Sequence, residues 1–592
     1  MAYSLDPSSF PEPLDLSHHL SRSTKAREAS RVKQFYKYFQ IPGIGQLAGG
    51  LPNDKYFPYD TLEAKVALPN RWKPTPNKPV DPPTSESAST SASKDDPPAA
   101  RLLVPHDSKV ADPLRMIDLK SALQYGTAQG YPSLYYFIRQ FTRNHLHPFV
   151  PYKEGPEVVL TCGSTDGFSK AIQALSDEWS QNHDPVNERP GLLVEQYCYM
   201  NAVQTAQPRG LNIVPVAIDD EGMLATGKGG LQDVLENWDF TRGRRPHLIY
   251  TVTIGQNPTS GTLSVERRKQ IYALCVKYDI IIIEDDPYWY LQFPSSSPTT
   301  PTPTPSKSSG FEFLDSLIPS YLSIDYQGRV IRLDTFSKTV APGCRLGWIT
   351  AQPALIERIL RISETSTQQP SGFVQSMIAE LIMGPQGSSD GGRGGAADGS
   401  GWKVDGWVRW LEGLRGNYER RMNKMCDILD AGKFVVKAGR RNSLLEVAGS
   451  QDEWSVVQKS QIYDFGRPLG GMFVWIRFDF STHPLRKVVP ASRLSRALWV
   501  FWTTKPYLVL VAPGGTFSPT KEIKEDDAYN CFRLCFAACA EDELESTSKR
   551  FAHGAQAFWR IKSKEKIDKL LEDDEGGVAS IDAGMALLTG MC

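Results

Sequence analysis

One lysine in the chain, Lys338, stands among residues that could support a reactive amine. It follows the strand-like run VIRLDTF (330–336) and lies between Ser337 and Thr339, and Arg345 comes seven residues later, after a Pro-Gly turn. Lysine can form a Schiff base with an aldehyde, and a desolvated cationic pocket lowers its pKa toward the neutral form that this needs. Lys338 is therefore either a surface charge or the working amine of a site, and the rest of the chain must decide.

Three further polar clusters also follow strand-like runs. The pairs of run and cluster are EVVLTC (157–162) with GSTDGF (163–168), HLIYTV (247–252) with TIGQNPTSG (253–261), and IIII (280–283) with EDDPYWY (284–290). In α/β sheets, ligands bind at the carboxyl ends of the strands. Four such clusters therefore predict one convergent site, whereas a single one would mean little.

The residue types in these clusters suit a phosphorylated pyridine aldehyde. Glycines and hydroxyls in GST (163–165), at the start of a helix, offer backbone N–H groups to a phosphate. Thr335, Ser337 and Arg345 could complete that cradle, the arginine through two parallel hydrogen bonds. A carboxylate of EDD could pair with a protonated pyridine nitrogen, and Tyr288 and Asn257 could hydrogen-bond a ring oxygen. These groups together describe pyridoxal phosphate, whose ring acts as an electron sink.

Three adjacent acids compete for the ring nitrogen. Taken alone, Glu284, Asp285 and Asp286 would usually be loop or helix-capping charges. Side chains alternate across a strand, which puts Asp285 on the opposite side from Glu284 and Asp286. We therefore predict that Asp285 is the carboxylate of the site.

The elements that must position these residues alternate between strand and helix up to about residue 401. Besides the four runs named above, strand-like runs occur at 191–196, 211–218 and 345–350, and helical spacing appears at 167–179 and 264–278. Apolar runs separated by helices predict a mostly parallel sheet covered by helices on both faces. From residue 402 the order becomes a helix, three strand-like runs (472–478, 507–512 and 530–537) and a closing helix (542–561), which predicts a smaller α+β domain.

The motifs, in this order, resemble the fold-type-I, class I/II pyridoxal-phosphate aminotransferases. The nearer likeness is to the branch of the fungal aromatic-amino-acid aminotransferases and the kynurenine/2-aminoadipate aminotransferases. The segments that carry it are LAGGLPNDKYFP (47–58), LQYGTAQGYPSL (123–134), TCGSTDGF (161–168), NPTSG (257–261), IIEDDPYWYLQF (282–293), DTFSKTVAPGCRLGW (334–348) and NCFRLCFA (530–537). They span the chain apart from three low-complexity insertions.

The resemblance implies a role for each matching residue. Lys338 would hold the cofactor and shuttle a proton at the substrate α-carbon, and Asp285 would pair with the pyridine nitrogen. Tyr199 would stack on the ring, and Arg533 would clamp the substrate α-carboxylate. The remaining implied contacts are Asn257 and Tyr288 to the ring oxygen, Ser164, Thr165, Thr335, Ser337 and Arg345 to the phosphate, Tyr125 to the phosphate of the neighbouring subunit's cofactor, and Gly50 and Asn257 to substrate.

Two details of the site stay open at this point. The family segment commonly has a proline two residues before the stacking aromatic, and here that position is Tyr197, so Tyr197 and Tyr199 compete for the role. A dicarboxylic acceptor needs a cationic or polar contact for its second carboxylate, and Arg22, Arg27 or Arg31 of the N-terminal arm could supply it. We expect no metal.

The resemblance implies a transaminase that moves the amino group of an aromatic amino acid to 2-oxoglutarate. The alternatives are a kynurenine or 2-aminoadipate transaminase, and a β-elimination or decarboxylation on the same cofactor. A third alternative, from another class, is an amino-acid sensor with an inactive aminotransferase fold. The intact lysine and the lack of a preceding helix-turn-helix module argue against the sensor. A homodimer with active sites at the subunit interface is expected.

Composition sets the remaining expectations. The net charge of −1 gives no electrostatic case for a nucleic-acid partner, the apolar runs are too short to span a membrane, and no leader is recognised, so a cytoplasmic protein is expected. The domains predicted are an N-terminal arm with a substrate-pocket segment (1–60), a disordered insertion (61–100, Pro/Ser/Thr-rich from 73), a large cofactor-binding domain (101–401) with disordered insertions at 294–309 and 384–401, and a small domain (402–592).

Overall fold

A computed structural model describes residues 10–31, 38, 41–45, 47–74, 99–294, 309–384, 401–438 and 457–578 of the 592-residue chain. The chain divides into two compact units. The first comprises residues 1–256, 261–419 and 469–471, and the second comprises 257–260, 420–468 and 472–592. The long helix α11 (Lys403–Gly432) therefore begins in the first unit and ends in the second. Most of the insertions at 73–100, 294–309 and 384–401 lie outside the described residues.

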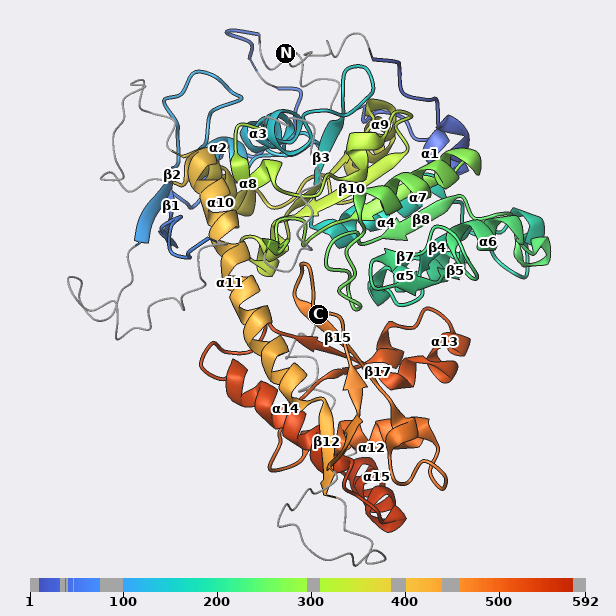
Figure 1. Ribbon diagram of the computed structural model, residues 1–592. Coiled ribbons are helices and arrows are strands. Elements are labelled where there is room, and N and C mark those ends of the chain that lie inside the picture. Colours follow the sequence, from blue (N-terminus) through green and yellow to red (C-terminus); the bar gives the residue numbers. More distant parts are fainter. Residues whose placement is uncertain are drawn as a thin grey trace, which may run out of the picture. The chain divides into compact units, whose positions relative to one another are not determined.

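The first unit is built on a seven-stranded sheet with the order β3-β11-β10-β9-β8-β4-β5 (Figure 1). Its strands are β3 (Glu157–Thr161), β4 (Gly191–Glu195), β5 (Asn212–Val216), β8 (Leu248–Thr251), β9 (Ile281–Asp285), β10 (Val330–Thr335) and β11 (Gly347–Ala351). All pairs are parallel except those of β11, which runs antiparallel to both β10 and β3. Every residue of β4, β8, β9, β10 and β11 is buried. The prediction of a mostly parallel, doubly covered sheet is confirmed.

Helices cover this sheet on both faces. Helix α4 (Ser164–Leu175) packs on β10 and β11, where the bare backbone of Gly167 lets it approach Leu333 and Ile349. On the opposite face, Ile282 and Val330 share a core cluster with Ile271 of α7 (Val265–Lys277). Asp285 pairs in register with Leu333, so its side chain belongs to the α4 face, whereas Glu284 belongs to the α7 face.

The first segment of the predicted insertion 61–100 is ordered, which corrects the expected boundary. β1 (Thr61–Ala67) pairs antiparallel with β2 (Ala99–Pro105). The alternating sequence TLEAKVA is partly buried at every second position, and Leu102 and Val104 of β2 are fully buried in the core. The pairing satisfies the backbone hydrogen-bonding groups of 61–67. Of the predicted insertion, residues 75–98 lie outside the described residues.

The second unit contains an antiparallel four-stranded sheet with the order β14-β15-β17-β16. These strands are β14 (Tyr463–Asp464), β15 (Phe473–Phe478), β17 (Cys531–Cys535) and β16 (Ala512–Pro513), and the helices include α12 (Ala491–Thr503), α14 (Leu544–Phe558) and α15 (Lys564–Val578). The strands expected at 472–478 and 530–537 and the closing helix are present. The strand expected over 507–512 is wrong: only Ala512 and Pro513 pair, because Leu508 adopts a left-handed φ of 49° that an extended ladder excludes.

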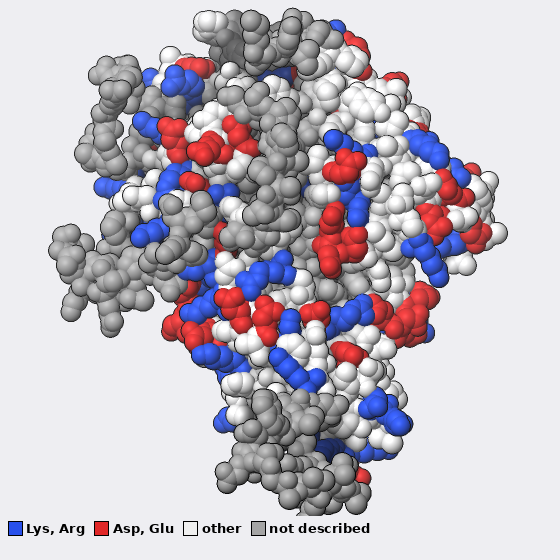
Figure 2. All heavy atoms as spheres, viewed as in Figure 1, with Lys and Arg blue, Asp and Glu red and all other residues white. Residues whose placement is uncertain are grey.

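Charges of both signs are interspersed over the described residues of the face drawn in Figure 2. Within the described residues, the structure has no helix long and apolar enough to cross a membrane.

Candidate active site

The site is built from side chains at the carboxyl ends of neighbouring strands in the first unit. Lys338 ends a short 3-10 helix (Phe336–Lys338) that follows β10, and Thr335 caps this helix by accepting a hydrogen bond from the Ser337 amide at 3.2 Å. The lysine is partly buried, and its ammonium has no hydrogen bond or ion pair with any residue in the described ranges. An amine at a strand end with no partner of its own is available to a ligand.

Strand β11 brings the hydroxyls after β10 next to the start of α4. Gly347 of β11 pairs with Thr335 on one side and with Thr161, the last residue of β3, on the other. Two residues after Thr161 comes Gly163, the N-cap of α4, with a φ of 93°. The antiparallel strand, which the sequence did not distinguish from its parallel neighbours, is thus what places Thr335 and α4 side by side.

Arg345 completes this group. Its backbone is left-handed (φ 45°), and its guanidinium donates to the Cys162 carbonyl at 3.0 Å. A Cβ built on Gly163 would lie only 2.7 Å from an Arg345 nitrogen, so a side chain at 163 would displace the arginine. Ser164 is partly buried at the first turn of α4, and Thr165 beside it is exposed. The free N–H groups of a helix start, beside hydroxyls and a guanidinium, form an anion-binding cradle.

Asp285, the last residue of β9, is buried and only half satisfied. It is 5% exposed, and its Oδ2 accepts a hydrogen bond from the Tyr250 hydroxyl at 2.8 Å. Its Oδ1 is buried and accepts no hydrogen bond from the residues that the structure describes. Burial raises the pKa of Asp285 to about 7, while the hydroxyls of Tyr250 and Ser164 lower it. A buried carboxylate oxygen without a donor is costly, so this site is chemically incomplete without a cationic or N–H-bearing partner.

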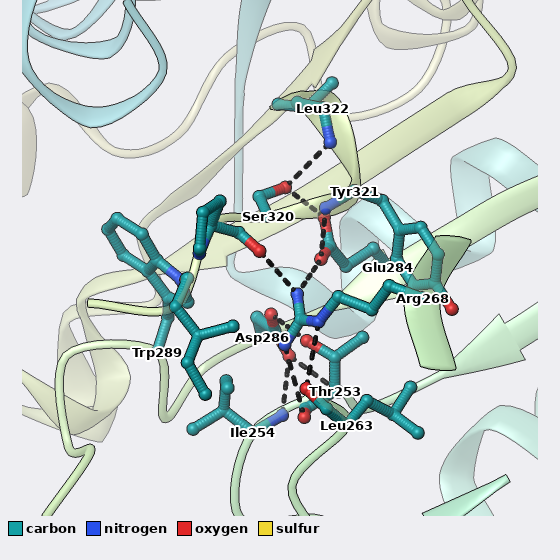
Figure 3. Close-up of polar contacts among 12 residues, drawn as sticks. Thr253, Ile254, Leu263, Arg268, Glu284, Asp286, Trp289, Ser320, Tyr321 and Leu322 are labelled. Carbon is teal, nitrogen blue, oxygen red and sulfur yellow. Dashed lines mark hydrogen bonds and ion pairs between the residues drawn. The ribbon is translucent and has the colours of Figure 1, made fainter. Parts of the chain in front are cut away.

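The two neighbouring acids are already paired on the opposite face of the sheet. Glu284 lies 3.3 Å from Arg268 and 3.2 Å from Arg332. Figure 3 shows Glu284 and Asp286 within a polar cluster that includes Arg268, Thr253, Ser320 and Tyr321. Asp286 accepts from the Thr253 amide at 2.8 Å and lies 3.3 Å from Arg332. Asp285 alone among the three retains an unpartnered oxygen, as the alternation of the strand predicts.

The two tyrosines that compete for the ring-stacking role differ in burial. Tyr197 is 2% exposed, and its carbonyl accepts from the Gln256 side chain at 2.7 Å. Tyr199 precedes helix α5 (Met200–Ala206), is partly exposed, and its hydroxyl accepts from Asn201 at 2.7 Å. Tyr199 therefore presents the more accessible ring. Tyr288 lies in the turn after β9 and is buried at 4% exposure.

Tyr125 and Gly50 lie on the surface of the described chain. Tyr125 is 59% exposed, and the neighbouring Gln124 side chain donates to the Pro52 carbonyl at 2.8 Å, which joins the two segments. Gly50 is exposed, and a Cβ built there meets no atom within 4 Å. Both residues are therefore accessible from the surface of the described chain.

Each of the three N-terminal arginines has a polar partner within its own chain. Arg22 pairs with Asp177 at 3.4 Å, and Arg27 donates to Thr365 at 2.7 Å. Ser21, next to Arg22, donates to the carbonyl of Ala174 at the C-terminal end of α4. Since the start of α4 carries the cradle and a helix rises about 1.5 Å per residue, Arg22 lies more than ~10 Å from it. Arg31 pairs with Glu28 on the surface.

Two predicted substrate residues meet within the second unit. Arg533 of β17 donates to the side-chain oxygen of Asn257 at 2.7 Å. Its guanidinium lies 4.3 Å from the ring centre of Phe473 and 4.6 Å from that of Phe517. The two rings hold the guanidinium in place by cation–π attraction.

Two buried groups of the site were missed in the sequence. Tyr250 is 1% exposed and donates to Asp285. Its place inside the apolar run HLIYTV looked like that of a core aromatic. Glu195 ends β4, is 1% exposed and has one unpartnered oxygen, and burial raises its pKa to about 7. Glu195 could have been identified from the sequence as an acid that ends an apolar strand-like run.

The residues present fit pyridoxal phosphate. The cradle of α4, Thr335, Ser337 and Arg345 suits its phosphate, the unpartnered Oδ1 of Asp285 suits a protonated ring nitrogen, and the unpaired Lys338 suits its aldehyde.

Comparison with known proteins agrees with this geometry. Residues 93–443 match the sequence profile of the family Aminotransferase class I and II. An aromatic amino acid aminotransferase of Schizosaccharomyces pombe is 35% identical over 80% of this chain and 84% of its own length. An L-tyrosine:2-oxoglutarate aminotransferase of Serpula lacrymans is 32% identical over 81% of this chain and 78% of its own.

A solved structure supports the same relationship. The crystal structure of aminotransferase Aro8 from Candida albicans matches with a TM-score of 0.69 at 31% identity, over 93% of this chain and 100% of that one. This chain belongs to the class I and II aminotransferase family and has its fold. It is an aminotransferase.

Proposed function

We propose that this enzyme transfers the amino group of an aromatic amino acid to 2-oxoglutarate with pyridoxal phosphate as its cofactor. The single observation that supports the cofactor is the buried carboxylate of Asp285, which has an unpartnered oxygen. Asp285 ends β9, and the neighbouring strand β10 leads to Lys338. The substrate class is supported by the relatives, among them proteins named aromatic amino acid aminotransferase and L-tyrosine:2-oxoglutarate aminotransferase.

The cofactor, when bound, supplies an aldehyde for the amino group and an electron sink for the bond broken at the substrate α-carbon. The start of α4, Thr335, Ser337 and Arg345 would bind and orient its phosphate. Asp285 would hold the proton on the ring nitrogen, while Tyr250 fixes the carboxylate in place through Oδ2. A neighbouring carboxylate favours the protonated ring, so the charge of Asp285 matters as much as its shape.

Lys338 has the central role in proton transfer. We propose that its amine would hold the cofactor and that its Nζ would serve as the base that moves a proton at the substrate α-carbon. Asn257 and Tyr288 orient the ring through its oxygen, and Tyr199 covers one ring face in preference to the more deeply buried Tyr197. Arg533 binds the α-carboxylate of every substrate alike, so it contributes affinity without selecting among side chains.

We also propose a homodimer and a cytoplasmic location. The dimer is supported by the exposure of Tyr125, Gly50, Arg22 and Arg31, which would then act on the neighbouring subunit's site. The partners are amino acids and 2-oxo acids.

The substrate is tested by a panel of twenty amino acids with kynurenine and 2-aminoadipate, each against 2-oxoglutarate. Phenylalanine and tyrosine are expected to have the highest kcat/KM. A tenfold lead for alanine, aspartate or a branched-chain amino acid, about 1.4 kcal/mol, would overturn the aromatic preference. A higher kcat/KM for kynurenine or 2-aminoadipate than for phenylalanine and tyrosine would establish the alternative function as a kynurenine or 2-aminoadipate transaminase. Detecting glutamate and the 2-oxo acid separates transamination from elimination, and no turnover at all would favour the sensor.

A further inference from the structure

An arginine in the first unit is buried without any polar partner. Arg415 of α11 is 5% exposed. No hydrogen bond or ion pair joins its side chain to another residue of the described ranges, and its Nε is fully buried without an acceptor. The ring centre of Phe313 lies 4.7 Å from the guanidinium carbon. Burial lowers the pKa of Arg415, and the Glu412 and Glu419 carboxylates on the same helix offset this only in part. The buried guanidinium therefore lacks the direct hydrogen-bonded acceptor that an anion would supply.

Arg415 lines a cavity of about 610 Å³ that is separate from the residues of the candidate active site. None of the predicted cofactor or substrate residues lines it. Its apolar lining comes from Phe293, Phe311, Phe313, Ile318, Val408 and Leu469. This volume falls in the range of pockets that enclose a small organic molecule, and apolar walls with a few polar groups are typical of such pockets.

The charged residues of the lining determine how a ligand would be oriented in the cavity. Arg409, one turn and a half before Arg415 on α11, donates to the Trp72 carbonyl at 2.9 Å, but another of its nitrogens is buried without an acceptor. Glu312, Asp405 and Glu412 also line the cavity, and no ion pair joins any of them to Arg415 within the described residues. None of them accepts a hydrogen bond from the guanidinium, and a carboxylate is the group that matches its planar fork.

We propose that this cavity binds a small carboxylic acid with an aromatic or aliphatic body, whose carboxylate pairs with Arg415 and whose body packs on the phenylalanines. The ligand class follows from the two halves of the lining. An inorganic anion would leave the apolar wall uncovered, and an apolar molecule without an acid would leave Arg415 unpaired. Occupancy would stabilise the first unit, and so the site is a means by which an organic acid can act on the enzyme without entering the active site.

The test uses phenylacetate as the probe, with 2-phenylethylamine as the matched probe that lacks the carboxylate. Binding to the purified holoenzyme is followed by calorimetry and by the rise in Tm with probe concentration. Phenylacetate should bind, with at least tenfold weaker binding in Arg415→Met and unchanged binding in Arg560→Met, which removes an exposed arginine of the second unit. The amine should bind at least tenfold more weakly than the acid.

Two further variants keep the outcome decisive. Arg533→Met removes the proposed substrate clamp, and phenylacetate binding that disappears there but survives in Arg415→Met would place the acid in the active site and overturn the proposal. Ser316→Trp fills the cavity from an exposed position of its lining, so it should abolish binding even if Arg415→Met fails to fold. No binding to the wild type at 10 mM (an estimate of the weakest useful affinity, about −2.7 kcal/mol) would also refute the site.

Discussion

The buried Asp285 makes a prediction about the stability of the cofactor-free protein that does not depend on turnover. Burial raises its pKa from 3.8 to about 7. Since the folded pKa lies above the unfolded value, the folded protein favours the protonated acid, and this advantage is lost as the pH rises toward 7. At 1.36 kcal/mol per pKa unit the full loss is about 4 kcal/mol, of which about 2–3 kcal/mol falls between pH 5 and pH 8.

Asp285→Asn should remove this loss. The amide keeps the shape of the side chain and can still accept the Tyr250 hydrogen bond, but it carries no charge at any pH. The Tm of the cofactor-free variant should therefore exceed that of the cofactor-free wild type by a few degrees at pH 8 and by much less at pH 5. Thermal unfolding of both proteins from pH 5 to pH 8 measures the difference. Other buried acids with raised pKa values, such as Glu195 and Glu380, are present in both proteins, so their contributions to the pH dependence cancel in the difference between the two Tm values.

The matched controls are Glu284→Gln and Asp286→Asn. Each removes a carboxylate that is paired with the buried Arg332, so each should lower the Tm at every pH, with a cost of about 3–5 kcal/mol. A difference between Asp285→Asn and the wild type that stays constant from pH 5 to pH 8 would refute the reasoning. With the cofactor bound, Asp285→Asn should cripple turnover while cofactor stays bound, and near-normal turnover would transfer the role to Asp286 or Glu284.

Three other predictions concern the site and the insertions. Borohydride should fix the cofactor to the peptide that contains Lys338, whereas Lys338→Ala should remain uncoloured after reduction and dialysis; a label on another peptide would end the proposed role. Arg533→Lys should raise KM for amino acid and 2-oxo acid alike, by about tenfold, because a lysine cannot form two parallel hydrogen bonds with a carboxylate; a change confined to one substrate would mean that Arg533 reads side chains. Deleting 295–308 or 385–400 should change the Tm and kcat/KM little, since loop length costs little, and a large loss in either variant would show that the segment is needed.

The edges of these insertions illustrate what composition could and could not predict. The Pro/Ser/Thr-rich stretch ends at Ser309, which composition places inside the insertion. In the structure Ser309 is 4% exposed, and its carbonyl lies 2.6 Å from the His145 ring. A single serine has the same composition whether it is buried or exposed, and only the distant His145 distinguishes the two. The deletions proposed above therefore keep Ser309.

Strand positions were predictable because burial on both faces leaves an unmistakable apolar run. All seven runs between 157 and 351 became strands of one sheet. Pairing direction was less accessible: β11 is as apolar as its parallel neighbours, and nothing local to it encodes that it runs antiparallel. The error at 507–512 has a related cause. That run alternates buried Val509 and Val511 with exposed Leu508 and Leu510, as a strand would, but without backbone pairing until Ala512.

Within the site, the residues that could be predicted are those whose neighbours along the chain already constrain them. Alternation alone separates Asp285 from Glu284 and Asp286, and the structure adds the reason that the separation matters, because Arg268 and Arg332 occupy only the other face. Tyr250 and Arg415 lacked such a constraint. Along the chain, each looks like an ordinary residue of its helix or strand. What distinguishes them are contacts with residues distant in sequence, which are the Asp285 carboxylate for Tyr250 and the Phe313 ring for Arg415. Unpaired buried polar groups therefore identify candidate sites that motifs miss, since a folded chain retains such a group at a cost that a ligand can offset.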